Sequence, residues 1–336
     1  MNGDSPREGA LFIVTHTDLD GVGSAAAALR VTGRSLSDVV ILYAEPYNVH
    51  EALEIVEEHA SKGDTLLVSD LGPNRDSFPR AIETIRRLVE EGVNVEWYDH
   101  HIWSREDQEA LRAAGAYLAL DTSTCATGVV VHYASRRRGL EPDDFLLELE
   151  RAVCAADLWR WDHYLAPKLF RVADSRYEEG REAWRNRLVE KFSNGIIWDE
   201  ELEEKLVEYV DLELKNYNSI LRTTYVTGEP CRVAAASKKR GPPSNSFLGA
   251  SLQSRYNADI AVIIRDNGGM SLRSRNVNVQ KIAVELGGGG HPRAAGARIK
   301  IPFTVRLLSI IFGRRMLSRY AARKVREVAL KLGICG

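Results

Sequence analysis

Acidic and imidazole side chains follow three apolar, strand-like runs of this chain, each at the point where the run ends. In chain order they are His16, Asp18 and Asp20 after residues 11–14, Asp70 after residues 66–68, and Asp99, His100 and His101 after residues 93–97. The carboxyl ends of parallel strands meet at one edge of a sheet, where α/β proteins build their sites. Carboxylates and imidazoles gathered there are the ligands that a pair of divalent metal ions requires. The spacing therefore indicates a metal site.

The first group also has a purely structural interpretation. His16, Asp18 and Asp20 alternate along the chain, so in extended geometry they point the same way and one turn can offer three ligands. An Asx-type turn that caps a helix at Gly21 would use the same residues. Asp70, taken alone, is typical of a helix N-cap or a turn.

The later group is harder to explain without a site. Asp99, His100 and His101 are three adjacent titratable groups after a buried strand, which is costly unless a metal or hydrogen bonds satisfy them. Asp157 follows the apolar helical residues 152–156 and is a weaker signal by itself. Together, the four groups indicate one metal centre assembled from distant parts of the chain.

The elements that would position these residues follow an α/β pattern. From residue 11 to residue 156, strand-like and helical patterns alternate, which favours an N-terminal doubly wound parallel sheet. We expect this domain to span residues 1–176 and a charged helical connector to span residues 177–223. A smaller C-terminal α/β substrate-binding domain follows over residues 224–302, and residues 303–336 form a basic amphipathic helix.

Composition places few limits on function. The 336 residues suggest two domains, and 45 Lys and Arg against 47 Asp and Glu give no global sign of a polyanion-binding protein. The four cysteines show no C-x-x-C spacing, so we expect reduced thiols in a cytoplasmic protein. The N-terminus lacks the apolar core of a secretion signal, and the apolar residues 307–312 are too few to span a bilayer.

A glycine run near the C-terminus is a second candidate for chemistry. Gly287–Gly290 precedes His291 and Arg293, and such a run lets the backbone approach a ligand and present N–H groups to an anion. His291 and Arg293 can add charged hydrogen bonds to a phosphate. A glycine-rich turn without these neighbours is usually only a loop.

The combination resembles the DHH phosphoesterase superfamily with a C-terminal DHH-associated (GGGH) domain. The resemblance rests on residues 15–21, 69–72, 99–101 and Asp157, and continues in residues 271–274 and 287–296. The resemblance covers residues 11–301. Within the superfamily, the chain most resembles RecJ-like and nanoRNase-like phosphodiesterases of archaeal type. It implies a site in the cleft between the two domains.

The resemblance also implies a role for each candidate residue. Two Mn²⁺ ions, with Mg²⁺ as a substitute, would be held by His16 and Asp18 (first ion), by Asp20, His100 and Asp157 (second ion), and by Asp70 (both ions). His16 departs from a common family pattern in which the ligating histidine lies farther before the paired acids. Asp99 would orient an imidazole and His101 would face the substrate phosphate. Substrate would be bound by Arg273, Gly288, Gly289, Gly290, His291 and Arg293.

The implied function is a Mn²⁺-dependent phosphodiesterase that hydrolyses nucleic-acid ends or short oligonucleotides, with single-stranded or short RNA or DNA as its partner. The alternatives are a nucleotide phosphatase acting on 3′-phosphoadenosine 5′-phosphate, a cyclic-dinucleotide phosphodiesterase, or a subunit of a replication or repair complex. The basic tail has three interpretations: it packs on the body of the protein, it binds nucleic-acid phosphates, or it docks on a protein partner. Nothing in the sequence supports a membrane partner.

Overall fold

The computed structural model describes residues 9–174 and 180–335 and divides the chain into two compact units. The first unit ends at Leu206 and the second begins at Val207, both within one long helix, α10 (Glu200–Leu221). The expected α/β fold class is confirmed, and each unit is described by itself.

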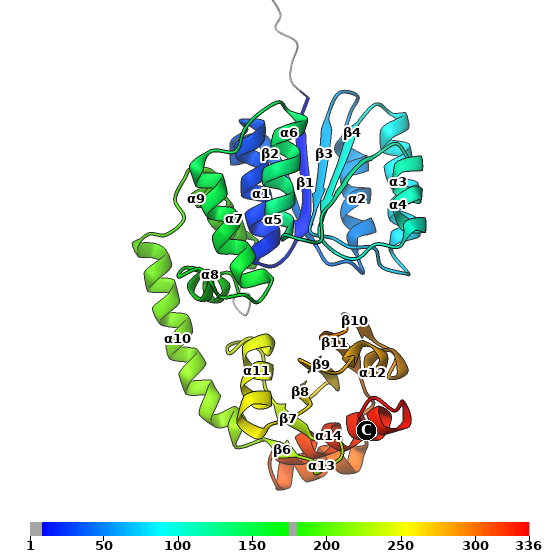
Figure 1. The fold of residues 1–336 in the computed structure, drawn as a ribbon, viewed down its shortest axis with the longest axis vertical. Helices are drawn as coiled ribbons and strands as arrows, with labels where there is room; N and C mark the ends of the chain where they lie inside the picture. Colours follow the sequence, from blue (N-terminus) through cyan, green and yellow to red (C-terminus); the bar gives the residue numbers. More distant parts are fainter. Residues whose placement is uncertain (1–8, 175–179, 336) are drawn as a thin grey trace, which may run out of the picture. The chain divides into compact units, whose positions relative to one another are not determined.

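The first unit is built on a five-stranded parallel sheet in the order β2-β1-β3-β4-β5 (Figure 1). Its strands are β1 (Leu11–His16), β2 (Val39–Ala44), β3 (Thr65–Ser69), β4 (Asn94–Asp99) and β5 (Tyr117–Leu120). The order of the strands reverses between β1 and β3, so the loops after these strands diverge and leave room for a site. Strand β5 and the helix before it did not stand out in the sequence pattern.

Helices cover both faces of this sheet, as a doubly wound fold requires (Figure 1). One face packs against α1 (Leu19–Thr32), the continuous helical segment α5 (Ala126–Val129), η2 (a π-helical turn, Val130–Ala134) and α6 (Ser135–Arg137), and against α7 (Asp144–Asp157), α8 (Ala166–Ala173) and α9 (Arg181–Ser193). The other face packs against α2 (Val49–His59), α3 (Phe78–Glu90) and α4 (Arg105–Ala113). A short 3₁₀ turn, η1 (Leu36–Asp38), precedes β2.

The second unit is a mixed six-stranded sheet in the order β10-β11-β9-β8-β7-β6. Its strands are β6 (Tyr225–Val226), β7 (Val233–Ser237), β8 (Ile260–Ile264), β9 (Gly269–Arg273), β10 (Gly289–Gly290) and β11 (Ala294–Arg298). Helices α12 (Val279–Glu285) and α14 (Arg315–Lys331) pack on one face, and α11 (Asn245–Tyr256) packs on the other. Residues 294–298 of β11 pair in register with β9.

Two helices, α9 and α10, occupy the described part of the expected helical connector. Helix α9 contributes Leu188, Val189 and Phe192 to the core of the first unit, and only α10 continues into the second. Residues 177–179, where the connector was expected to begin, lie outside the described residues.

The tail is two helices, not one. Helix α13 (Phe303–Ile311) ends shortly before Gly313, whose φ of +82° lies in the left-handed region that glycine adopts at no steric cost because it has no Cβ. Helix α14 buries Leu317, Ala321 and Val325 in the core of the second unit. The apolar face of α14 therefore packs on the second unit, whereas Leu307, Ile310 and Ile311 of α13 are exposed. In the described part of the chain, no helix combines the length and apolar character needed to cross a bilayer.

The prediction of four free thiols is wrong. Cys125 pairs with Cys154 in the first unit, and Cys231 pairs with Cys335 in the second. The paired cysteines are 29 and 104 residues apart in the chain. Tertiary packing brings them together, so local cysteine spacing carries no sign of the bonds.

Candidate metal centre

The loops that leave β1, β3 and β4 place their acids and imidazoles at the carboxyl edge of the parallel sheet. Close approach of β1 and α1 makes this possible, because a Cβ on Gly21 would lie 2.1 Å from the carbonyl oxygen of His16. Asp18 fits both interpretations of its segment, the helix cap and the metal ligand. Its Oδ1 caps α1 by accepting from the backbone N–H groups of Asp20 and Gly21, while its Oδ2 lies 3.0 Å from Nδ1 of His16.

The first ligand group consists of His16, Asp18 and Asp70, whose donor atoms lie within 4.8 Å of one another. Glu45, which the sequence analysis missed, completes it: its Oε2 lies 3.1 Å from Nε2 of His16, and its Oε1 accepts from the hydroxyl of Thr17. Glu45 directly follows β2. The rule that identified the other acids, position at the end of a strand, would have found it.

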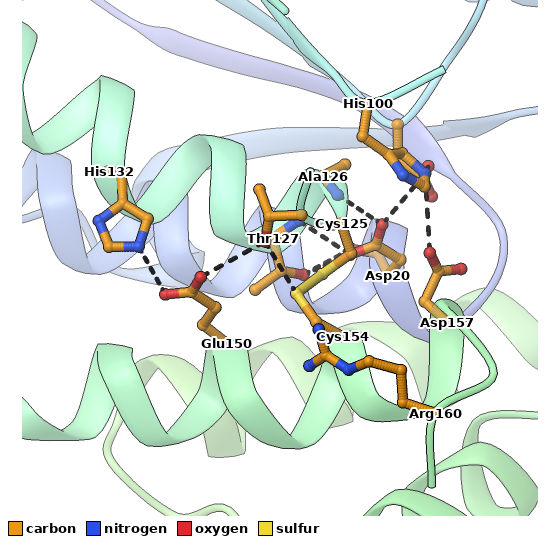
Figure 2. The surroundings of a disulfide bond; sticks show 12 residues. Asp20, His100, Cys125, Ala126, Thr127, His132, Glu150, Cys154, Asp157 and Arg160 are labelled. Carbon is orange, nitrogen blue, oxygen red and sulfur yellow. Dashed lines mark hydrogen bonds and ion pairs between the residues drawn. A yellow bond between two sulfur atoms is a disulfide. The ribbon is translucent and has the colours of Figure 1, made fainter. Parts of the chain in front are cut away.

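The second ligand group consists of Asp20, His100 and Asp157, again with donor atoms within 4.8 Å of one another. Nε2 of His100 lies 3.7 Å from Oδ2 of Asp20 and 3.7 Å from Oδ2 of Asp157 (Figure 2). These distances are too long for hydrogen bonds. The ligand atoms of Asp20, His100 and Asp157 thus face one another without hydrogen bonds between them, an arrangement suited to binding one cation.

Asp70 links the two groups. Its Oδ1 lies 3.5 Å from Nε2 of His100, and its Oδ2 lies 3.4 Å from Nδ1 of His16. The side chain is buried, and its Oδ2 has no hydrogen-bond partner among the described residues. The backbone of Asp70 adopts φ +58°, an uncommon conformation that clusters at functional sites.

Asp20 is held from behind by the start of the helical segment α5. Its Oδ2 accepts from the backbone N–H of Ala126, and its Oδ1 accepts from both the backbone N–H and the hydroxyl of Thr127 (Figure 2). These donors fix the carboxylate while Oδ2 still faces His100. The sequence analysis found neither Ala126 nor Thr127, because their contact with Asp20 depends on tertiary packing.

The electrostatics of the second group favour a cation. Burial raises the pKa of Asp20 to about 7, and the charge of Asp70 adds to this effect. Burial also raises the pKa of Asp157 well above its ordinary range, with Asp20 and Asp70 contributing. Burial disfavours the imidazolium of His100, but the surrounding carboxylates outweigh it and raise its pKa to about 10. Protons thus take the place of positive charge that a metal ion would supply.

His16 behaves in the same way. Burial disfavours its charged form, yet the carboxylates of Asp18, Asp70 and Glu45 raise its pKa well above the ordinary value. Both ligand groups are therefore clusters of negative charge that bind protons in compensation.

Asp99 and His101 form a separate pair beside these groups. Oδ1 of Asp99 lies 2.8 Å from Nδ1 of His101, and its Oδ2 accepts from the indole N–H of Trp103 at 2.6 Å. Burial alone would raise the pKa of Asp99, but the bonds from His101 and Trp103 lower it. Asp99 is therefore a carboxylate that orients the ring of His101.

The candidate substrate residues of the second unit gather on neighbouring strands. Arg273 on β9 lies in register with Ala294 on β11, and the backbone N–H of Ser274 donates to the carbonyl of Arg293. The guanidinium of Arg273 donates to the Leu272 carbonyl and the Ser246 hydroxyl, and no carboxylate among the described residues pairs with it. Burial lowers its pKa. It is a partly desolvated cation suited to an anionic ligand.

The glycine run has two different roles. A Cβ on Gly288 would lie 2.1 Å from the carbonyl oxygen of Gly296, and one on Gly290 would lie 2.7 Å from Cα of Ala295. These two glycines are required by the β10–β11 pairing itself. A Cβ on Gly289 would meet nothing within 4 Å, so a side chain here would point into open space. His291 and Arg293 follow and are exposed.

The donor set fits hard divalent ions. It consists of carboxylate oxygens and imidazole nitrogens without thiolate, which suits Mn²⁺ or Mg²⁺. Ligands around an octahedral ion at about 2.1 Å lie about 3 Å apart, so the observed 3.0–3.7 Å separations need only a small contraction. The buried, unpartnered Oδ2 of Asp70 supplies a further donor.

Comparison with known proteins finds two family models that match this chain. The family model described as the DHH family, N-terminal domain, matches residues 10–156, and the DHHA1 domain matches residues 243–309. The oligoribonuclease NrnB of Bacillus subtilis (strain 168) is 23% identical over 299 residues, which cover 85% of this chain and 72% of that protein.

Solved structures share the fold. A RecJ exonuclease bound to manganese has a TM-score of 0.57 at 20% identity, covering 96% of this chain and 94% of that one. RecJ from Thermus thermophilus in complex with Mn²⁺ has a TM-score of 0.59 at 19% identity, covering 94% of this chain and 52% of that one. The two family domains and the strand-end carboxylates lead to one conclusion. The chain belongs to the DHH phosphoesterase superfamily and is a metal-dependent phosphoesterase that carries the family's C-terminal DHHA1 domain.

Proposed function

We propose that the protein is a Mn²⁺-dependent phosphodiesterase that hydrolyses short oligonucleotides or nucleic-acid ends. The observation that carries the proposal is the position of Asp70, which directs one carboxylate oxygen toward each of two ligand groups. A carboxylate shared in this way is the arrangement that a two-metal site needs.

In this proposal the ligands are divided between two ions. His16, Asp18 and Asp70 hold the first ion, with Glu45 supporting His16 through Nε2. Asp20, His100 and Asp157 hold the second, and Asp70 is common to both. When bound, two divalent ions stabilise charge on the phosphoryl oxygens and lower the pKa of the attacking water.

His101 contributes a charged contact to the substrate. Asp99 engages Nδ1 of this ring, so the contact with a phosphate oxygen is assigned to Nε2. Burial disfavours the imidazolium, but Asp99 raises the pKa of His101 above its ordinary value. A protonated ring donates from both nitrogens, and this ring lies beside Asp70 and His100.

Residues of the second unit support this substrate class. Arg273, His291 and Arg293 are suited to a terminal nucleotide phosphate, and Gly289 permits close backbone approach. The activities of two similar proteins support short substrates. One is an oligoribonuclease, and the other is the pGpG-specific phosphodiesterase PggH of Vibrio cholerae. The match to the PggH structure has a TM-score of 0.53 at 14% identity and covers 92% of this chain and 99% of that one.

The test is a cleavage assay with end-labelled RNA and DNA, from dinucleotides to long single strands, in Mn²⁺, in Mg²⁺ and in EDTA. We expect metal-dependent cleavage that is strongest on the shortest substrates. Asp70→Ala should abolish it, whereas Asp76→Asn, a change at an exposed acid in the following loop, should not. Absence of metal-dependent cleavage of every substrate would refute the proposal, and uniform shortening of long strands would favour a processive exonuclease instead.

A further inference from the structure

The Cys125–Cys154 disulfide lies beside Asp20 of the second ligand group (Figure 2). Cys125 is the N-cap residue directly before α5, and the first two residues of that helix, Ala126 and Thr127, donate the backbone hydrogen bonds that hold Asp20. The position of Cys125 therefore sets the position of the groups that fix this carboxylate.

The other end of the bond lies beside another ligand. Cys154 is in the last turn of α7, and Asp157 ends the same helix. Residues three apart on a helix lie on the same side, so movement of Cys154 carries Asp157 with it. The disulfide thus joins two segments, one that holds Asp20 and one that carries Asp157.

The surroundings of the bond make it an internal link. Both cysteines are buried, with exposed fractions of 0% and 2%, and both belong to the core between the sheet and its covering helices. The hydroxyl of Thr124 lies 3.4 Å from Sγ of Cys154 and 3.4 Å from Oε1 of Glu150. A reductant in solution has no direct route to either sulfur.

A link at this point has a physical purpose. Asp20, Asp70 and Asp157 direct carboxylates into one small volume, and whenever they are ionised without a metal ion, their repulsion pushes Asp157 at the end of α7 away from Asp20, which the start of α5 holds. Noncovalent packing yields to such a force, whereas a covalent bond does not. The binding energy of an ion is then not spent on drawing the two segments together.

We propose that the Cys125–Cys154 disulfide, together with Thr127, is a positioning device that sets the affinity of the Asp20–His100–Asp157 group for a divalent ion. The proposal rests on the metal centre of the proposed function. It assigns no chemical step to the sulfurs, and a bond that merely stabilised the fold would leave the metal affinity of the folded protein unchanged.

The test is Mn²⁺ binding without substrate, with free Mn²⁺ measured by its electron paramagnetic resonance signal. In the Cys125→Ser/Cys154→Ser protein we expect one of two sites to weaken by roughly 10- to 100-fold, the effect typical of residues that orient metal ligands. The other site should be unchanged. The matched control is Cys231→Ser/Cys335→Ser, which removes the disulfide of the second unit and should leave both affinities unchanged.

A second pair of variants tests the proposal if the Cys125→Ser/Cys154→Ser protein does not fold. Thr127→Val removes the hydroxyl bond to Asp20 but keeps the backbone N–H bond, and should weaken the same site. Thr127→Ser restores the hydroxyl and should restore the affinity.

Equal Mn²⁺ affinity in the Cys125/Cys154 variant and its control, or in Thr127→Val and the unaltered protein, would overturn the inference. A second result would also overturn it. If a preparation of the unaltered protein with full Mn²⁺ affinity is then unfolded in denaturant and alkylated, and Cys125 and Cys154 react as free thiols, the disulfide is not needed for that affinity. An unaltered protein that binds no Mn²⁺ would instead refute the metal centre, so the two failures are distinguishable.

Discussion

Asp70 directs its Oδ1 to within 3.5 Å of Nε2 of His100 from a backbone position, φ +58°, that few non-glycine residues adopt. The second oxygen of the same carboxylate turns toward His16 and has no hydrogen-bond partner among the described residues. An unusual backbone conformation and an unsatisfied buried oxygen both carry a free-energy cost. A cation bound on each side of Asp70 would offset both.

Glu45→Gln is expected to weaken metal binding at the first ligand group by roughly 10- to 100-fold, because the variant removes the negative charge that orients His16 and favours its Nδ1 as the metal-facing nitrogen. Mn²⁺ titration with and without the change measures the effect. Glu58→Gln alters an exposed acid on α2 and is the matched control. Equal affinities in the two variants would remove Glu45 from the site.

The metal-free protein should lose stability as the pH rises. The folded pKa of Asp20, about 7, lies above its ordinary value of 3.8, so its stabilising contribution is complete below about pH 4 and is lost as the pH rises through 7. The raised pKa of His100 acts in the same direction, with a contribution complete below 6.5 and lost as the pH approaches 10.

Urea unfolding in EDTA at about pH 5 and about pH 8 measures this dependence. Asp20→Asn cannot ionise, so its free energy of unfolding should fall less over the same interval. Mn²⁺ should restore the stability of the unaltered protein at the higher pH. An identical pH dependence for Asp20→Asn and the unaltered protein would show that burial does not raise the pKa of Asp20.

Arg273→Gln is expected to raise the KM for short oligonucleotides roughly 10- to 100-fold with little change in kcat, since a charge-assisted hydrogen bond contributes about 1.5–3 kcal/mol. Lysine is not an equivalent replacement, because it lacks the planar fork of the guanidinium. Arg275→Gln alters an exposed neighbour that bonds Ser254 and serves as the control. A loss confined to kcat would contradict a binding role for Arg273.

The glycines of the second unit should separate stability from binding. Gly288→Ala forces a Cβ to 2.1 Å from a carbonyl oxygen and should lower the free energy of unfolding by about 1–3 kcal/mol. Gly289→Ala meets no atom within 4 Å and should leave stability nearly unchanged while raising KM. Urea unfolding and steady-state kinetics on the same two variants provide the comparison. If Gly289→Ala leaves KM unaltered, the backbone of this turn does not contact substrate.

Several features were accessible from the sequence because they are local. The α/β fold class and the family assignment are confirmed, and both depend on apolar periodicity and on short motifs at strand ends. Position at the end of a strand or helix also brought the six proposed ligands to notice, and the structure places them in two adjoining groups. Their roles as ligands remain predictions. Glu45 satisfied the same positional rule and was missed because it stands alone, without a neighbouring acid or histidine.

Other features had no local sign. The two disulfides, the division of the tail at Gly313 and the requirement for Gly288 by the β10–β11 pairing all depend on which segments pack together. The prediction of free thiols, which relied on cysteine spacing, was wrong for this reason. The prediction of a single tail helix was wrong because apolar residues continue on both sides of Gly313.

The sequence by itself determined which chemical groups are available and at which strand ends they stand, because strand period and motif spacing are local properties. Only the tertiary structure decided how they are used. It turned one oxygen of Asp70 toward each histidine, set Ala126 and Thr127 behind Asp20, and joined Cys125 to Cys154. Those relationships arise where segments far apart in the chain meet, and the free energy of packing, not local preference, selects them.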